Sequence, residues 1–467
     1  MTHTPSLAAT AKLVRESFMS AVVVVMVLLG AATPALAQGL NIIRDTEIEN
    51  LLQMYARPVF QAGNLEPNAI TIRLIQDGSI NAFVTQGNQM FLHTGLLLAA
   101  KNSNEVIGVM AHETGHIVGG HSVTFSDSMA KANTIALLTT LLGVAAGVLA
   151  KNADVGMAVG MGGQGTALRA LLAFSRDQEN RADQFAITAL DATKQSPKGL
   201  YEFFERLSGQ ELLSTDRQDP YMMTHPLTRS RMDVVENAVK NSPYTDKPLD
   251  PAIEAQHRRM IAKLFAFLKP QLTTLQKYPE SDKSVEARYA RSVAYFRRGQ
   301  TDKALPLIDG LIADFPRDPY FWELKGQMLF ETGKLDASVA AYRESTKLLP
   351  NAPLNLVAMS HAMVETANPE YAEEAQKALK AALSYDAEDP WAWDLLAKSY
   401  LQSDKPGLSA YAASERALIQ GQFQDVVRYS KEAEKLLEKD TPTWYRLQDI
   451  RVTAQNQLQE FIERRRR

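Results

Sequence analysis

The chain has 467 residues, a length that favours two or more domains over a single hydrophobic core. Its 45% hydrophobic and 22% charged residues are typical of a globular protein, and its net charge of -3 provides no general attraction to nucleic acid. The chain contains no Cys, which excludes disulfides, thiolate metal sites and thiol catalysis. Any metal would therefore be bound by His and carboxylate side chains.

The first 37 residues have the pattern of an export signal. Lys12 and Arg15 precede an apolar run over residues 18–32, and the following segment ends in the small-x-small pattern that a signal peptidase accepts. We expect cleavage after Ala37 and a mature chain in a bacterial periplasm, because the disulfides of most secreted eukaryotic domains are missing. A retained membrane anchor is the alternative, although the run is short for a span of about 20 residues.

Residues 69–94 have the alternation of short β-strands. Ile70, Ile72 and Leu74 alternate with polar residues, and the dipeptides Asp77-Gly78 and Gly87-Asn88 indicate turns. We therefore expect a small antiparallel sheet in this segment.

The next segment predicts a helix that carries a metal-binding motif. Asn102 and Glu105 form a capping box, and residues 112–116 read His-Glu-Thr-Gly-His. Residues four apart share one face of a helix, so His112 and His116 can bind one Zn²⁺ while Glu113 reaches the attacking water. Two ordinary His residues on a surface helix are the alternative.

Two apolar stretches follow this helix, over residues 134–150 and 153–174. The first has 17 residues, which is marginal for crossing a bilayer. One interpretation is a hairpin beside the active site that packs in the core or makes peripheral contact with a membrane surface. The other is true membrane insertion, since Gly143 and Gly147 would suit close helix contacts in lipid.

A catalytic zinc site usually has a third protein ligand, which we expect downstream. The metzincin pattern is disfavoured because Ser122 stands where it requires His, and His121 is one place early. In the charged segment over residues 178–183, Glu179 and Asp183 share one helical face. Glu179 would complete the ligand set, and Asp183 could accept the second N–H of a ligand imidazole. From the residues alone, a charged segment of this kind is more often a solvated helix face.

The second half of the chain has an internal repeat. Residues 241–251 form a Pro-containing linker, and beyond them Gly299 and Gly333 are 34 residues apart, as are Pro316 and Pro350. A period of 34 residues is typical of stacked helix pairs.

This half resembles the tetratricopeptide repeat family. Trp322, Gly326, Tyr342 and Pro350 fall where that pattern has Trp, a small residue, an aromatic residue and Pro. The match weakens later in the chain, and the third unit is a few residues longer. The resemblance implies about four helix pairs with a curved surface for a polypeptide partner, and a plain helical bundle is the alternative.

The first half resembles the gluzincin metallopeptidases, which include the CAAX prenyl protease, HtpX and the periplasmic BepA-like proteases. The resemblance rests on H-E-x-x-H followed by E-x-x-x-D in an Arg-Ala-Asp context. It implies that His112, His116 and Glu179 bind one zinc ion, that Glu113 is the catalytic base and that Asp183 orients a ligand.

The same resemblance covers residues 45–240 and implies two further features. His225 and Arg231 match a His-Pro followed by a basic residue, where the His either steadies the tetrahedral intermediate or plugs the site. An edge strand beside the cleft, to which a substrate could add as an extended strand, is matched by Asn81, Ala82 and Phe83. Without the resemblance these residues indicate only a turn and an ordinary sheet edge.

These observations predict a mainly α protein. We expect a signal peptide over residues 1–37, an α+β zincin-type peptidase domain with a small antiparallel sheet over residues 38–245, and an all-α repeat solenoid over residues 252–467. His93, His121 and His361 are assigned no role in the site.

The expected function is an exported zinc metalloendopeptidase. By resemblance, its clients are misfolded or stalled outer-membrane proteins, and the repeats dock clients or the outer-membrane assembly machinery. The alternative is a repeat scaffold or chaperone for outer-membrane protein assembly whose metal site is latent.

Overall fold

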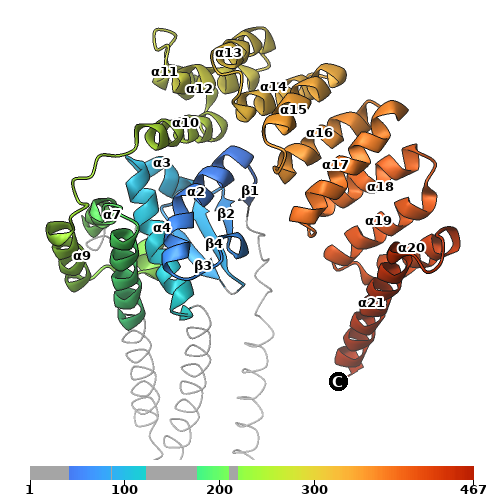
Figure 1. The fold of residues 1–467 in the computed structure, drawn as a ribbon, viewed down its shortest axis with the longest axis horizontal. Coiled ribbons are helices and arrows are strands. Elements are labelled where there is room, and N and C mark those ends of the chain that lie inside the picture. Colours follow the sequence, from blue (N-terminus) through green and yellow to red (C-terminus); the bar gives the residue numbers. More distant parts are fainter. Residues whose placement is uncertain (1–40, 86, 122–175, 210–218, 467) are drawn as a thin grey trace, which may run out of the picture. The chain divides into compact units, whose positions relative to one another are not determined.

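The computed structural model describes residues 41–85, 87–121, 176–209 and 219–466. Within them the fold is mainly helical with one four-stranded sheet, which confirms the predicted fold class (Figure 1). The predicted signal segment and the apolar stretches over residues 134–174 lie outside the described residues. The described part of the chain holds no helix with the length and apolar character that crossing a membrane requires.

The elements before residue 250 build the region that carries the predicted metal motif. Its strands are β1 (Ile42–Ile43), β2 (Thr71–Ile75), β3 (Ala82–Thr85) and β4 (Gln89–His93). Its helical elements are α2 (Thr46–Ala62), η1 (Pro67–Ala69), α3 (Thr94–Ala99), α4 (Ser103–Val118), a helix over residues 176–192, α7 (Lys198–Ser208), α8 (Pro220–Thr224) and α9 (Arg229–Asn241).

The prediction of an antiparallel sheet is wrong for one strand pair. The strand order is β1-β2-β4-β3, with β3 antiparallel to β4 but β2 parallel to β4. In β4, Met90 and Leu92 are fully buried, whereas β3 is mostly half-buried after Ala82. β4, the more deeply buried of the two strands, occupies an inner position, and β3 lies at the edge of the sheet.

A hydrophobic core joins this sheet to α2 and α4. Leu52 and Phe60 of α2, Leu92 of β4, and Val109 and Met110 of α4 belong to it and are at most 1% exposed. A side chain of this size contributes roughly 1.5–3 kcal/mol when fully buried. The core therefore holds the motif-bearing α4 firmly against the sheet.

The remaining helices run from residue 251 to residue 466. They are α10 (Pro251–Leu268), α11 (Gln271–Lys277), α12 (Val285–Phe296), α13 (Thr301–Asp314), α14 (Pro319–Glu331), α15 (Leu335–Leu348), α16 (Pro353–Glu365), η4 (Pro369–Tyr371), α17 (Ala372–Tyr385), α18 (Pro390–Gln402), α19 (Pro406–Ile419), α20 (Phe423–Leu436) and α21 (Pro442–Arg466). From α12 onward, consecutive helices pack as antiparallel pairs that follow one another along the chain (Figure 1).

The 34-residue period comes from the turns between paired helices. Gly299 and Gly333 end their turns with φ of 72° and 74°, a left-handed conformation that favours glycine. Within α14, a Cβ at Gly326 would lie 2.8 Å from the ring of Tyr342, so the small residue permits the close approach of α15. The insertion that lengthens the third unit contains η4.

Helix α10 contributes to two cores. Met260 and Leu264 pack in the core of the sheet region, whereas Ala262 and Ala266 pack with α12 and α13. The sequence analysis assigned this helix to the repeats alone. Because its two faces serve both cores, α10 continues the packing across the predicted linker.

A buried ion network accompanies α10. The Lys263 ammonium lies 2.7 Å from Asp45 Oδ2 and 3.2 Å from Glu47 Oε2, and Tyr289 donates a hydrogen bond of 2.9 Å to Glu47. Glu323 lies nearby with one carboxylate oxygen buried and without a hydrogen-bond partner among the described residues. Burial, reinforced by the charges of the neighbouring carboxylates, raises the pKa of Glu323 to about 7 despite Lys263.

This raised pKa gives a pH dependence to the stability. The folded state keeps the Glu323 proton up to about pH 7, whereas an ordinary Glu loses it near 4.5. The contribution to the free energy of unfolding is thus fully present below about pH 4.5 and is lost as the pH rises through about 7. In wild type this loss lowers the free energy of unfolding by up to about 3 kcal/mol as the pH rises. Glu323→Gln should abolish this pH-dependent decrease, as measured by urea denaturation at about pH 5 and pH 8. Equal pH slopes in wild type and variant would contradict this, and Glu344→Gln, on an exposed part of α15, is the control.

Candidate metal centre

Helix α4 presents the three polar residues of the motif toward the interior. Its N-terminus is capped by Asn102, whose side chain accepts the Glu105 N–H at 3.1 Å. His112 and Glu113 are fully buried, and His116 is 7% exposed. The alternative of two ordinary His residues on a surface helix is therefore inconsistent with the structure.

The helix over residues 176–192 reaches this site because the motif contains a glycine. A Cβ at Gly115 would lie 2.7 Å from the Cα of Ala182, so only glycine allows the two helices to approach this closely. This approach places Glu179 and Asp183 beside α4, and they are 3% and 1% exposed. The alternative of a solvated helix face is excluded for these two residues, although Asp177 and Arg181 of the same helix are exposed.

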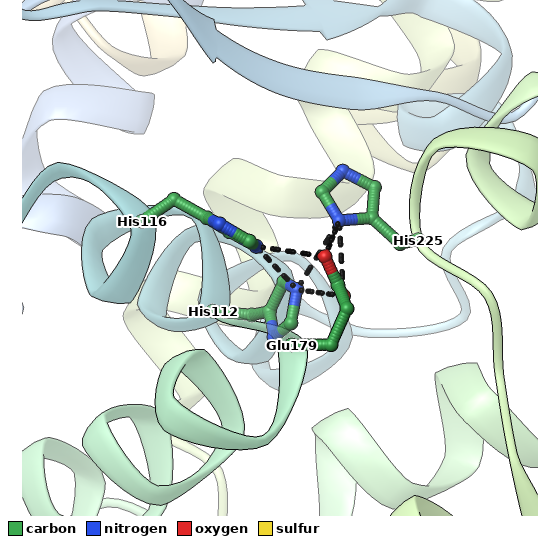
Figure 2. Close-up of side chains that lie close together, drawn as sticks. All are labelled: His112, His116, Glu179 and His225. Atoms are coloured by element: carbon green, nitrogen blue, oxygen red, sulfur yellow. Dashed lines mark hydrogen bonds and ion pairs between the residues drawn. The ribbon is translucent and has the colours of Figure 1, made fainter. Parts of the chain in front are cut away.

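Four side chains bring their ligand atoms together (Figure 2). His112 Nε2 lies 3.3 Å from Glu179 Oε2, and His116 Nε2 lies 3.3 Å from Glu179 Oε1. The two His Nε2 atoms are 3.2 Å apart, and His225 Nδ1 lies 3.1 Å from Glu179 Oε1. All the ligand atoms of the four residues lie within 4.8 Å of one another.

These distances fit a tetrahedral metal ion. At metal–ligand distances of about 2.0–2.2 Å, the ligand atoms of a tetrahedral site lie about 3.3–3.6 Å apart. The donor set of three imidazoles and one carboxylate also matches the nitrogen and oxygen ligands that zinc-type ions accept. The arrangement of the donor atoms can therefore hold one divalent metal ion.

Asp183 and Arg231 support the ligands from behind. Asp183 Oδ1 lies 2.8 Å from His112 Nδ1, and the buried Arg231 guanidinium donates to both oxygens of Asp183 at 2.6 and 2.9 Å. Arg231 Nη1 also lies 2.9 Å from Glu179 Oε2. One guanidinium thus contacts both the candidate ligand and the residue that orients His112, which is how bidentate Arg pairs fix a geometry.

The charges around the site keep the carboxylates of Glu179 and Asp183 ionised. Burial by itself would raise the pKa of Glu179, but the imidazoles of His225 and His112 outweigh it and hold this pKa well below its usual range. Burial likewise opposes ionisation of Asp183, whose pKa is lowered by hydrogen bonds from Arg231 and His112. In the absence of metal, Asp183 and Glu179 overcome burial and raise the pKa of His112 to about 9.

Glu113 lies beside the ligand cluster but is not part of it. Its Oε1 atom is 3.5 Å from His225 Nε2, and neither carboxylate oxygen has a hydrogen-bond partner among the described residues. Burial raises the pKa of this carboxylate above its usual value. A buried carboxylate with free lone pairs and a raised pKa is suited to accept and return a proton.

His225 is held over the site by the segment that precedes β3. Asp219 accepts the Ile80 N–H at 2.9 Å, and the Ile80 carbonyl accepts the Tyr221 N–H at 3.3 Å. The Tyr221 ring then packs 4.6 Å from the ring of His225. The His-Pro segment is therefore more than a surface turn, because it places a buried imidazole at the ligand cluster.

The predicted edge strand lies where the sequence analysis expected it in the sheet. Ala82 and Phe83 belong to β3, at the end of the sheet, and Asn81 precedes it. Asn81 is 6% exposed, and its Oδ1 atom has no hydrogen-bond partner among the described residues. The side of β3 away from β4 pairs with no other described strand.

Two buried His residues without an assigned role have close polar partners. His121 Nδ1 lies 2.9 Å from His116 Nδ1, and His93 Nδ1 lies 3.0 Å from the Ser79 hydroxyl. His361, in contrast, lies beside the rings of Phe330 and Trp391 and 3.7 Å from the Glu365 carboxylate. The sequence analysis missed the contact of His121, for which the preceding Gly119-Gly120 was the available signal.

Comparisons with known proteins cover the region that contains this site. The sequence model of peptidase family M48 matches residues 43–239, and a tetratricopeptide repeat model matches residues 289–353. The chain is 24% identical to the β-barrel assembly-enhancing protease of Yersinia pestis over 76% of this chain and 72% of that protein. It is 23% identical to the protein of the same name in Escherichia coli strain K12, over 83% of this chain and 78% of that protein.

Further relatives match smaller parts. A Vibrio cholerae protein is 28% identical over 60% of this chain and 58% of its own length. It is also named a β-barrel assembly-enhancing protease, as a provisional assignment. The protease HtpX of Shewanella pealeana is 26% identical over 41% of this chain and 75% of its own length. Together these matches indicate a metalloprotease.

Proposed function

Because residues 43–239 are a peptidase family M48 domain and tetratricopeptide repeats follow it, we propose that this chain is a zinc metalloendopeptidase acting on protein clients. The observation that carries the proposal is the tetrahedral spacing of the ligand atoms of His112, His116 and Glu179, with Glu113 beside them. These three residues would hold the ion, which acts as a Lewis acid toward the scissile carbonyl when bound.

The side chains around the ion would carry the proton transfers. Glu113 accepts a proton from the attacking water and returns it to the leaving amine, since its oxygens are otherwise unpaired. Asp183 fixes the tautomer of His112, and Arg231 holds Glu179 in place. A substrate would extend the sheet at β3, next to Asn81, Ala82 and Phe83.

Export, clients and partners follow from other parts of the chain. The leader pattern of residues 1–37 supports a periplasmic location for the mature protein. The names of the relatives refer to β-barrel assembly and support clients among β-barrel proteins. Misfolded or stalled outer-membrane barrels are the substrates that we propose. The helix pairs from α12 to α21 would dock these clients or their assembly machinery. Residues 134–174 could add a peripheral membrane contact.

The test is metal content together with peptide hydrolysis. The purified mature chain, residues 38–467, should contain about one zinc per chain by mass spectrometry. It should cleave an unfolded fluorescent casein, lose this activity with a chelator and regain it when zinc is returned. A chain that takes up no zinc, even when zinc is supplied, would overturn the peptidase proposal in favour of the scaffold alternative.

The position of His225 favours a second candidate, a latent peptidase. His225 Nδ1 lies 3.4 Å from His112 Nε2 and 3.1 Å from Glu179 Oε1, which is ligand spacing. An imidazole in the fourth ligand position would occupy the place that substrate or water needs. The scaffold role of the repeats would then dominate until His225 moves away.

Replacing His225 separates its two roles. If the imidazole plugs the site, His225→Ala should raise peptidase activity toward casein several-fold at an unchanged zinc content. If it steadies the tetrahedral intermediate instead, the same variant should lose about 10²–10³-fold in kcat, as for the loss of one oxyanion donor. Unchanged activity would contradict both roles. Thr224→Ala is the neighbouring control, because the Thr224 hydroxyl donates to backbone carbonyls of its own helix α8.

A further inference from the structure

The ring of His121 folds back onto the helix that carries the metal motif. Helix α4 ends at Val118, and His121 follows after two glycines. The His121 side chain is buried, its Nδ1 atom lies 2.9 Å from His116 Nδ1, and the two rings meet edge-on with centroids 4.9 Å apart. His121 therefore contacts the nitrogen of His116 that points away from the ligand cluster.

The two glycines make this reversal sterically possible. Gly120 has a φ of 62°, a left-handed conformation that turns the chain back toward the helix. At Gly119, a Cβ atom would lie 2.2 Å from His121 Nε2, which is far inside the van der Waals distance. Any other residue at position 119 would push the His121 ring away from His116.

The direction of the hydrogen bond follows from the ligand role of His116. His116 Nε2 faces Glu179 and His112 in the cluster, so its lone pair is the one directed at a metal ion. The proton of the neutral imidazole then resides on Nδ1. Two nitrogens 2.9 Å apart share one proton, so His121 Nδ1 must be the acceptor.

We propose that His121 is a positioning residue that orients His116 for metal binding by accepting its Nδ1 proton. This inference rests on the proposed metal-dependent function. The role parallels that of Asp183, which lies 2.8 Å from the Nδ1 atom of the other ligand, His112. His121 itself is outside the group of residues whose donor atoms converge, so it acts through His116 rather than as a ligand. Partners of this kind set the tautomer and ring orientation of ligand imidazoles.

A matched pair of substitutions tests this role in the full mature chain. An Asn oxygen can stand where the His Nδ1 atom stands, whereas Leu has nearly the same size and accepts no hydrogen bond. His121→Leu should weaken zinc binding by about 10–100-fold in competition with a chelator, and His121→Asn should retain most of the affinity. Loading with Co²⁺ adds a spectroscopic measurement, since the visible absorption reports the ligand geometry. His121→Leu should change this absorption and His121→Asn should largely preserve it.

Gly119→Ala displaces the same ring without changing His121. It should weaken zinc binding, as His121→Leu does. Gly310→Ala is the control: its new Cβ would lie 3.9 Å from the Arg288 side chain, an ordinary contact, and zinc binding should be unchanged. Circular dichroism of each variant confirms that the helices have formed.

Three results would overturn the inference. Zinc affinity of His121→Leu equal to wild type would show that the contact has no positioning role. Equal losses in His121→Leu and His121→Asn would show that packing alone matters. A wild-type chain that binds no zinc would overturn the proposed function together with this inference, whereas the first two results leave the proposed function intact.

Discussion

Glu113→Gln should lower kcat for peptide hydrolysis by about 10²–10⁴-fold while zinc stays bound. Gln has the shape of Glu but cannot take a proton from water, so the change removes the base without opening a cavity. Glu113 is fully buried, and apart from the 3.5 Å approach to His225 its oxygens have no partner among the described residues. The approach to His225 is therefore the one contact with a described residue that changes with its charge.

The measurement combines steady-state kinetics with metal analysis. Zinc content near one per chain in Glu113→Gln would show that the loss belongs to the proton transfer and not to the metal site. Glu236→Gln is a matched control on α9, because the Glu236 side chain is exposed and, within the part of the chain that the structure describes, pairs with Lys240 one turn away. Activity of Glu113→Gln within about tenfold of the control would contradict the assignment of Glu113 as the base.

Glu179→Ala should remove most of the bound zinc. Glu179 Oε1 and Oε2 lie 3.3 Å from the Nε2 atoms of His116 and His112, so its loss leaves two imidazoles as the assigned ligands. Loss of a residue that only supports a ligand weakens metal binding by about 10–100-fold. Because Glu179 is itself an assigned ligand, we expect the zinc affinity to fall by more than about 100-fold. Peptidase activity should fall with it, because two ligands and a water rarely make a catalytic site.

The same helix provides the control for this substitution. Asp177→Ala also removes a carboxylate, but Asp177 is exposed, and its one ion pair with a described residue is with Arg181. This variant should keep its zinc and its activity. If Glu179→Ala retains its zinc in full, the third ligand is a different residue, and His225 becomes the first candidate because its Nδ1 atom already lies at ligand spacing.

Local patterns in the sequence were sufficient to predict the motif-bearing helix and the repeat helices. The capping pair Asn102 and Glu105 begins α4, and the i, i+4 spacing of His112 and His116 places both on one face without reference to any other segment. The 34-residue period likewise defines the helix pairs, because each pair is stabilised by its immediate neighbours. The extended third unit was visible for the same reason.

Contacts between segments that are distant in the sequence could not be predicted from such local patterns. The parallel pairing of β2 with β4 depends on the competition of β3 and β4 for the inner position of the sheet, which turn residues do not encode. The sharing of α10 between two cores depends on what packs against each of its faces. Neither feature has a signal in the spacing of residues along the chain.

The sequence by itself determined the chemistry that is available: a Cys-free chain with an H-E-x-x-H helix, candidate carboxylates downstream and helical repeats. The tertiary structure decided which of these groups meet. Gly115 lets Glu179 approach α4, Arg231 contacts both carboxylates, and the Gly119-Gly120 turn brings His121 onto His116. The physical reason is that ligand spacing of about 3.3 Å depends on backbone approach and burial across segments far apart in sequence, whereas helix periodicity depends only on neighbours along the chain.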